Sequence, residues 1–179
     1  MKSKMALAGS LWVALITTAS GAEPQPPDTL AVRIVPTTFR APAGRAITLG
    51  GPTQHFHVVV TNVSGNPIRV WREWCSWGYF TLSFQATDEA GKTTTVKKKD
   101  RGWRKNYPDW TTIPPGDHIV FEVSFDEATW QDPPLPEQGK SRTVRLRAIF
   151  EVPADPETKA NQVWTGKALS PEDAHTIYR

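Results

Sequence analysis

The sequence predicts an all-β protein built as an antiparallel sandwich of about seven to nine strands. Short segments rich in Val, Ile, Thr, Phe and Trp alternate with turn residues, and the 179 residues include 16 Pro and 12 Gly. No long segment has the apolar repeat of an amphipathic helix. Many short strands joined by Pro and Gly turns are typical of a single β-sandwich.

Residues 1–22 predict a cleavable secretory signal. Two Lys residues precede an apolar run, Met5–Ala19, which is shorter than the roughly 20 residues of a membrane-spanning helix. Ser20 and Ala22 place small residues third and first before a cleavage after Ala22. We therefore expect a protein that is exported to the periplasm or the extracellular space and is soluble after cleavage, without stable membrane insertion. Its expected parts are the signal 1–22, a Pro-rich segment 23–29 and one sandwich domain over 30–179.

The charge of the chain is nearly balanced once the signal is removed. The full sequence has 21 Lys and Arg against 18 Asp and Glu, and two of the Lys lie in the signal, which leaves 19 against 18. A global attraction to nucleic acid is therefore not expected, and any basic surface must be local. The single cysteine, Cys75, cannot form an internal disulfide, and we expect it to be buried.

Alternation of apolar and polar residues predicts the strands in order. Phe56, Val58 and Val60 alternate with mostly polar neighbours, as expected of a strand with one buried face. Gly116 in the sequence PPGD occupies the position of a type II turn that needs a positive φ. The predicted strands or strand-bearing segments are Leu30–Val35, Ala46–Leu49, the run around Phe56–Val60, a strand opened by Pro67, Tyr79–Ala86, Thr93–Lys99, Trp110–Ile113, His118–Phe125, Thr143–Val152, Asn161–Lys167 and Thr176–Tyr178.

The turns and strands between Phe56 and Phe125 follow a recognisable order. A strand ends in VTNVSGNPIRV, a hairpin surrounds TDEAGK, and TIPPGD precedes another strand. This order resembles the immunoglobulin-like fold of the bacterial intracellular proteinase inhibitor family and of uncharacterised exported bacterial domains. The resemblance implies an immunoglobulin-like sandwich, and proteinase inhibition is one function that it leaves open.

Two histidines on one strand offer a possible metal site. His55 and His57 are two residues apart, so their side chains leave the same face of the strand. The other two His of the chain, His118 and His175, are distant in sequence. Solvent-facing side chains are the alternative interpretation, and no cofactor is expected.

The most unusual segment of the sequence is VWREWCSWGYF, at residues 70–80. Trp71, Trp74 and Trp77 are spaced three apart and are followed by two more aromatic residues. Such rings either bind a protein or a sugar or close the core around Cys75. Because three Trp within seven residues are difficult to bury completely, we expect at least one to be partly exposed.

A basic stretch follows in VKKKDRGWRKNYPDW, at residues 96–110. It combines cationic residues with Trp103, which suits an anionic polysaccharide or an acidic protein surface, although a solvated hairpin end is the alternative. The basic residues are Lys97, Lys98, Lys99, Arg101, Arg104 and Lys105.

The sequence contains no recognised catalytic motif such as G-x-S-x-G, H-E-x-x-H or a Gly-rich phosphate loop. We therefore expect a non-catalytic exported module that contacts a protein or cell-envelope partner through these aromatic and basic residues. Carbohydrate binding, proteinase inhibition and metal binding are the alternatives.

Overall fold

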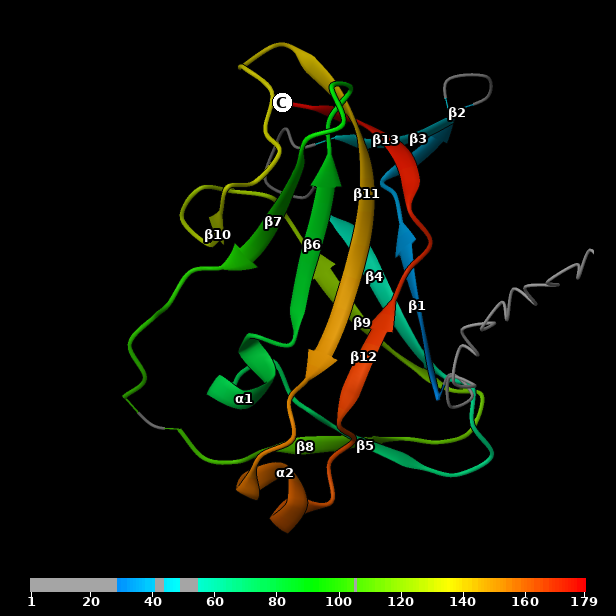
Figure 1. Ribbon diagram of the computed structural model, residues 1–179, viewed down its shortest axis with the longest axis vertical. Coiled ribbons are helices and arrows are strands. Elements are labelled where there is room, and N and C mark those ends of the chain that lie inside the picture. Colours follow the sequence, from blue (N-terminus) through cyan, green and yellow to red (C-terminus); the bar gives the residue numbers. More distant parts are fainter. Residues whose placement is uncertain (1–28, 41–43, 49–54, 105) are drawn as a thin grey trace, which may run out of the picture.

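The computed structural model describes residues 29–40, 44–48, 55–104 and 106–179 (Figure 1). Over these residues the chain forms thirteen strands and two short helices, which confirms the predicted all-β class. The expected signal 1–22 and most of the Pro-rich segment lie outside the described residues. The elements in chain order are β1 (Leu30–Val35), β2 (Thr38–Arg40), β3 (Gly44–Thr48), β4 (Phe56–Asn62), β5 (Ile68–Trp71), α1 (Ser76–Tyr79), β6 (Leu82–Thr87), β7 (Thr93–Lys98), β8 (Trp110–Ile113), β9 (His118–Val123), β10 (Trp130–Gln131), β11 (Ser141–Val152), α2 (Pro156–Asn161), β12 (Gly166–Leu169) and β13 (Asp173–Tyr178).

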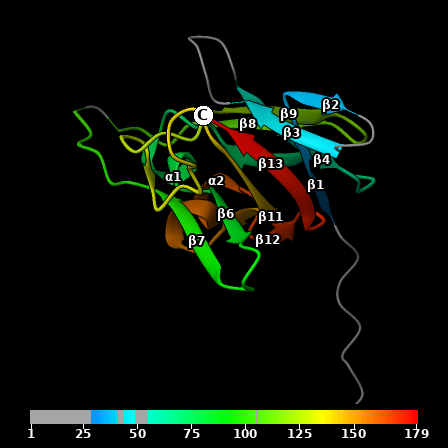
Figure 2. The same cartoon turned by 90° about the horizontal axis from the view of Figure 1, so that it is seen from above.

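The described strands form three sheets. A three-stranded sheet has the order β1-β4-β9, and an eight-stranded sheet has the order β10-β7-β6-β11-β13-β3-β2, with β12 pairing to β11. Strands β5 and β8 form a separate pair beneath the larger sheets (Figure 1). All of these pairings are antiparallel except β13 with β3. Seen from above, β4 and β9 lie on one side of the molecule and β6 and β7 on the other (Figure 2).

The two larger sheets share one core. Phe56 of β4 contacts Phe84 of β6, with ring centroids 5.8 Å apart, and Phe121 of β9 lies 5.8 Å from Phe150 of β11. Burial alternates along β4, as a strand with one core face requires. The long strand β11 buries four alternating residues, which are Val144, Leu146, Ala148 and Phe150.

The structure departs from the predicted strands in their number, thirteen instead of about seven to nine, and at the two helices. The strand expected from Tyr79 begins instead at Leu82, because residues 76–79 turn into α1. The second helix, α2, begins with a capping box in which Asp155 and Thr158 bond each other's backbone N–H groups, and Pro156 occupies its first turn. The sequence DPET at residues 155–158 contains this capping signal, which the strand prediction overlooked.

Candidate functional site

The three Trp of the segment 70–80 have three different environments. Trp71 is only 1% exposed and packs in the core. The expectation that it contacts a partner is therefore wrong. Trp77 is half-buried and lies 5.9 Å from Trp71 between ring centroids. Trp74 is 61% exposed, which confirms that one ring of the three reaches solvent.

A tight turn at α1 separates these rings. The N–H groups of Gly78 and Tyr79 both donate to the carbonyl oxygen of Cys75, at 3.2 and 2.9 Å. Gly78 lies so close to the preceding chain that a Cβ atom there would come within 2.0 Å of the Arg72 carbonyl oxygen. Cys75 is buried as expected, and its thiol donates to the same carbonyl oxygen at 3.2 Å. The turn therefore needs glycine at position 78.

The basic segment after β7 is attached to α1 by side-chain hydrogen bonds. The Ser76 N–H donates to Asn106 Oδ1 at 2.9 Å, and Asn106 Nδ2 donates back to Ser76 Oγ at 2.6 Å. The indole N–H of Trp74 donates to Asp109 Oδ2 at 2.5 Å. Arg72 lies over the Trp74 ring, with its guanidinium carbon 4.8 Å from the ring centroid. The segment around α1 and the segment 106–109, which are about 30 residues apart in sequence, thus form one surface.

Arg101 lies against two aromatic rings of this surface. Its guanidinium carbon is 4.1 Å from the Tyr79 centroid and 4.2 Å from the Trp103 centroid. The two rings meet edge to face at 5.6 Å, and Phe80 continues the cluster at 4.9 Å from Tyr79. Arg101 remains exposed and forms no ion pair with the other described residues. We call Trp74, Phe80, Arg101 and Trp103 the α1–loop surface.

The predicted basic residues do not form one exposed patch. Lys97 and Arg104 are exposed, whereas Lys99 donates to the Glu127 carbonyl oxygen at 2.6 Å. Lys98 points inward, so the expectation that it belongs to the exposed surface is wrong. The reason is the two-residue period of β7, because Lys98 shares the core-facing side of the strand with Val96. Lys105 lies outside the described residues.

Lys98 is held in a cage of aromatic rings and a carboxylate. Its side chain is 4% exposed and forms an ion pair with Glu73. Its ammonium lies 4.6 Å from the centroid of Tyr79 and 5.7 Å from that of Trp130. Aromatic faces attract a cation, so the cage replaces part of the hydration that Lys98 loses on burial. Val96, two residues earlier on the same strand, is the sequence signal for the inward-facing lysine.

A cleft of about 480 Å³ opens between α1 and α2 at the end of β11. Its wall is largely apolar, with Trp77 and Phe80 on the side of α1 and Val152 and Pro153 on the side of α2. Charged side chains also line it. The polar and charged lining residues are Ser76, Thr81, Ser83, Lys97, Lys98, Glu151, Asp155 and Thr158.

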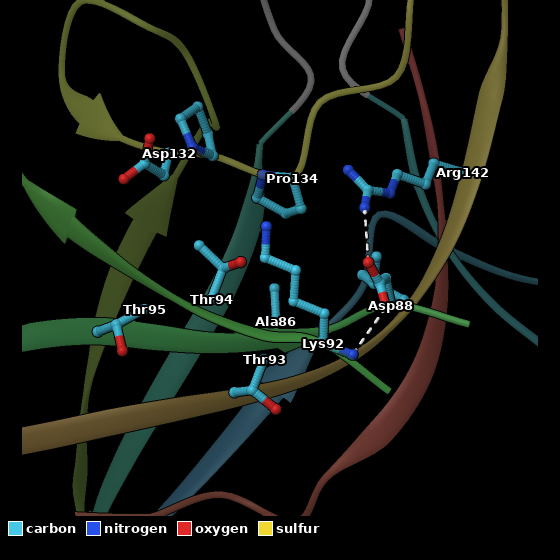
Figure 3. Close-up of a pocket in the computed structure, with 11 residues that line it drawn as sticks. Ala86, Asp88, Lys92, Thr93, Thr94, Thr95, Asp132, Pro134 and Arg142 are labelled. Carbon is cyan, nitrogen blue, oxygen red and sulfur yellow. Dashed lines mark hydrogen bonds and ion pairs between the residues drawn. The ribbon is translucent and has the colours of Figure 1, made fainter. Parts of the chain in front are cut away.

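A second, polar pocket of about 660 Å³ lies at the opposite end of β6 and β7 (Figure 3). Lys92 extends along it toward Pro134, and Arg142 is ion-paired with Asp88 at 3.6 Å. Three consecutive threonines, Thr93–Thr95, form part of its wall. The pocket is open and lacks aromatic residues, so we do not take it as the principal site.

The predicted histidine pair has a carboxylate neighbour. His55 Nδ1 lies 3.1 Å from Glu122 Oε1, and His57 is opposite Glu122 in the strand register. Within the described part of the chain, no three His, Cys, Asp or Glu side chains are grouped so that they could hold a metal ion.

No family model, no curated protein and no solved structure matches this chain. In the described ranges, neither helix is long and apolar enough to cross a membrane.

Proposed function

We propose that the protein is a non-catalytic exported module with an immunoglobulin-like sandwich, and that it binds a protein or cell-envelope partner through the α1–loop surface. Export, to the periplasm or the extracellular space, is inferred from the signal-like residues 1–22. The non-catalytic part of the proposal rests on the sequence, in which no catalytic motif was recognised.

The position of Arg101 carries the proposal. Its guanidinium lies over the Tyr79 and Trp103 rings, and its N–H groups bond no other described residue, which leaves them available to a carboxylate, sulfate or phosphate group. Trp, Tyr and Arg are the residue types most enriched at the energetic centres of protein interfaces. Here Tyr79, Trp103 and Arg101 lie together, and the exposed Trp74 is five residues before Tyr79 in the chain.

The surface is also organised before a partner arrives. The bonds from Trp74 and Ser76 to residues 106 and 109 hold the basic segment against α1. Ordering a loop on binding costs free energy. Because this loop is already held in place, binding a partner carries less of that cost.

Site-specific photo-crosslinking tests this proposal. Trp74 and Tyr107 are 61% and 74% exposed, and each can be replaced by the photoreactive aromatic residue p-benzoylphenylalanine with little effect on the core. Tyr178, exposed at the end of β13, is the matched control position. With cell-envelope fractions of the source organism, we expect one discrete crosslinked product from positions 74 and 107 and none from position 178.

A second substitution makes the crosslinking result specific. Adding Arg101→Ala should reduce the yield at position 74, because the stacked guanidinium is the predicted anion contact. Equal yields at all three positions, or a yield at position 74 that Arg101→Ala does not change, would contradict the proposed surface.

A further inference from the structure

The cleft between α1 and α2 has the size and wall chemistry of a small-ligand site. Its volume of about 480 Å³ is within the range of ligand pockets, which are mostly apolar with a few polar groups at fixed positions. Phe80, 46% exposed, belongs both to this cleft and to the α1–loop surface. The cleft therefore continues the proposed binding surface toward α2.

Three of the four charged side chains at the cleft already have a polar partner, two of them in ion pairs. Glu151 is ion-paired with Lys167 at 3.1 Å, and the Asp155 carboxylate accepts the Thr158 N–H at the start of α2. Lys98 is ion-paired with Glu73.

Lys97 is the exception among these charged groups. It is exposed on β7 and forms no ion pair or side-chain hydrogen bond with other described residues. The cleft therefore presents one cation without a polar partner among the described residues, beside an aromatic wall. A complementary ligand carries an anion next to an apolar face.

A pyranose ring that carries a carboxylate combines these features in a single unit. One face of such a ring displays C–H groups that pack on aromatic side chains, and its hydroxyls can bond Ser76 and Ser83 in the wall. A peptide side chain presents either an apolar ring or a carboxylate, but not both. We propose that this cleft binds an acidic saccharide, with a uronic-acid ring on Phe80 and Trp77 and its carboxylate at Lys97. The proposal deepens the binding function proposed above and rests on it.

Calorimetric titration of the purified protein tests the ligand class. The probes are a short oligogalacturonate, a neutral galactan oligosaccharide of the same length, and polyglutamate. We expect the oligogalacturonate to bind and the other two probes to show no measurable heat. Equally tight binding of polyglutamate would overturn the saccharide class in favour of an acidic peptide, and absence of oligogalacturonate binding would overturn the site altogether.

Paired variants locate the binding to the cleft. Lys97→Ala and Phe80→Ala should each weaken oligogalacturonate binding about tenfold or more, because each removes a charge-assisted or aromatic contact. The controls Lys92→Ala, which removes an equivalent charge at the far end of the hairpin, and Tyr178→Ala should stay within about twofold of the unmodified protein. All four side chains are exposed, so the variants should fold.

The outcomes separate the two proposals. Unchanged affinity in both Lys97→Ala and Phe80→Ala would overturn the cleft as the site, whatever the ligand. Crosslinking at position 74 that depends on Arg101 would still support the α1–loop surface in that case. Loss of that crosslinking together with intact, Lys97-dependent saccharide binding would instead remove the proposed surface and leave the cleft.

Discussion

Lys98 lies on the core-facing side of β7 and is ion-paired there with Glu73, a residue 25 positions earlier in the chain. The Glu73 side chain is partly exposed, whereas the Lys98 side chain is almost completely buried. The pair therefore joins the segment before α1 to the end of β7, next to the Tyr79 ring over which Arg101 also lies.

Replacing Glu73 should destabilise the protein more than replacing Lys98. Glu73→Gln leaves a buried cation without its counter-charge, and we expect a loss of about 2 kcal/mol in the free energy of unfolding, since Glu73 is only partly buried. Lys98→Met keeps the packing against Tyr79 and Trp130 and leaves a carboxylate that water can reach, so its loss should be about 1 kcal/mol or less. Urea unfolding of both variants measures the difference. The reverse order of the two losses would contradict the proposed pairing.

Gly78 should tolerate no side chain. Gly78→Ala places a methyl group against the Arg72 carbonyl, which cannot move without displacing β5, and we expect a loss of about 3 kcal/mol or more in stability. Gly65→Ala is the control, because a Cβ there meets nothing within 4 Å. Thermal unfolding compares the two, and equal midpoints would show that α1 adapts to the methyl group.

The strands whose residues alternate regularly could be predicted from the sequence. The period of two in residues 30–35 and 143–152 placed β1 at its observed bounds and β11 within two residues of them. Strand β8 also has its predicted bounds, and Gly116 has the expected positive φ of 78°. In these places local propensity and burial favour the same conformation.

The candidate site was less predictable because it depends on contacts between distant residues. The segment WCSWGY contains three aromatic residues, a type that favours strands, yet the close approach of Gly78 to Arg72 produces a helical turn. The direction of Lys98 depends on the register of β7 against β6, which places Phe84 opposite Val96. The attachment of Asn106 to Ser76 is a side-chain contact that no short-range pattern encodes.

The glycosylation sequon Asn62-Val63-Ser64 should be a structural motif and not a modification site. Asn62 is fully buried, and its amide nitrogen donates to the carbonyl oxygens of Asn66 and Ile113 at 2.7 and 2.9 Å. Its Oδ1 accepts the Ser64 N–H at 2.9 Å. Asn62→Ala should therefore cost about 3 kcal/mol or more in unfolding free energy, because the buried Ile113 carbonyl and two backbone groups of the following turn lose their partner.

Expression in a host that glycosylates secreted proteins checks the other half of this prediction. Intact-mass measurement of the folded, secreted protein should show no glycan at Asn62. A fully glycosylated protein with unchanged stability would contradict the buried position of this side chain.

The stability of the protein should fall in mildly acidic solution because of His175. This side chain is buried on β13, its Nε2 has no hydrogen-bond partner among the described residues, and its Nδ1 lies 2.9 Å from the Asp173 carbonyl oxygen. Burial, and secondarily the nearby Arg45 guanidinium, lower the pKa of His175 from 6.5 to about 4. Between these two values the unfolded chain binds a proton that the folded protein does not bind.

Stability should therefore rise with pH from about pH 4 to about pH 6.5 and then level off. The pKa difference corresponds to a contribution of roughly 3 kcal/mol, lost progressively as the pH falls through that window. In His175→Leu this part of the pH dependence should disappear, whereas His118→Leu, which alters an exposed histidine, should keep it. Urea unfolding of the three proteins at several pH values between 4 and 7 measures the slopes. A slope in His175→Leu equal to that of the unmodified protein would assign the pH dependence to another group.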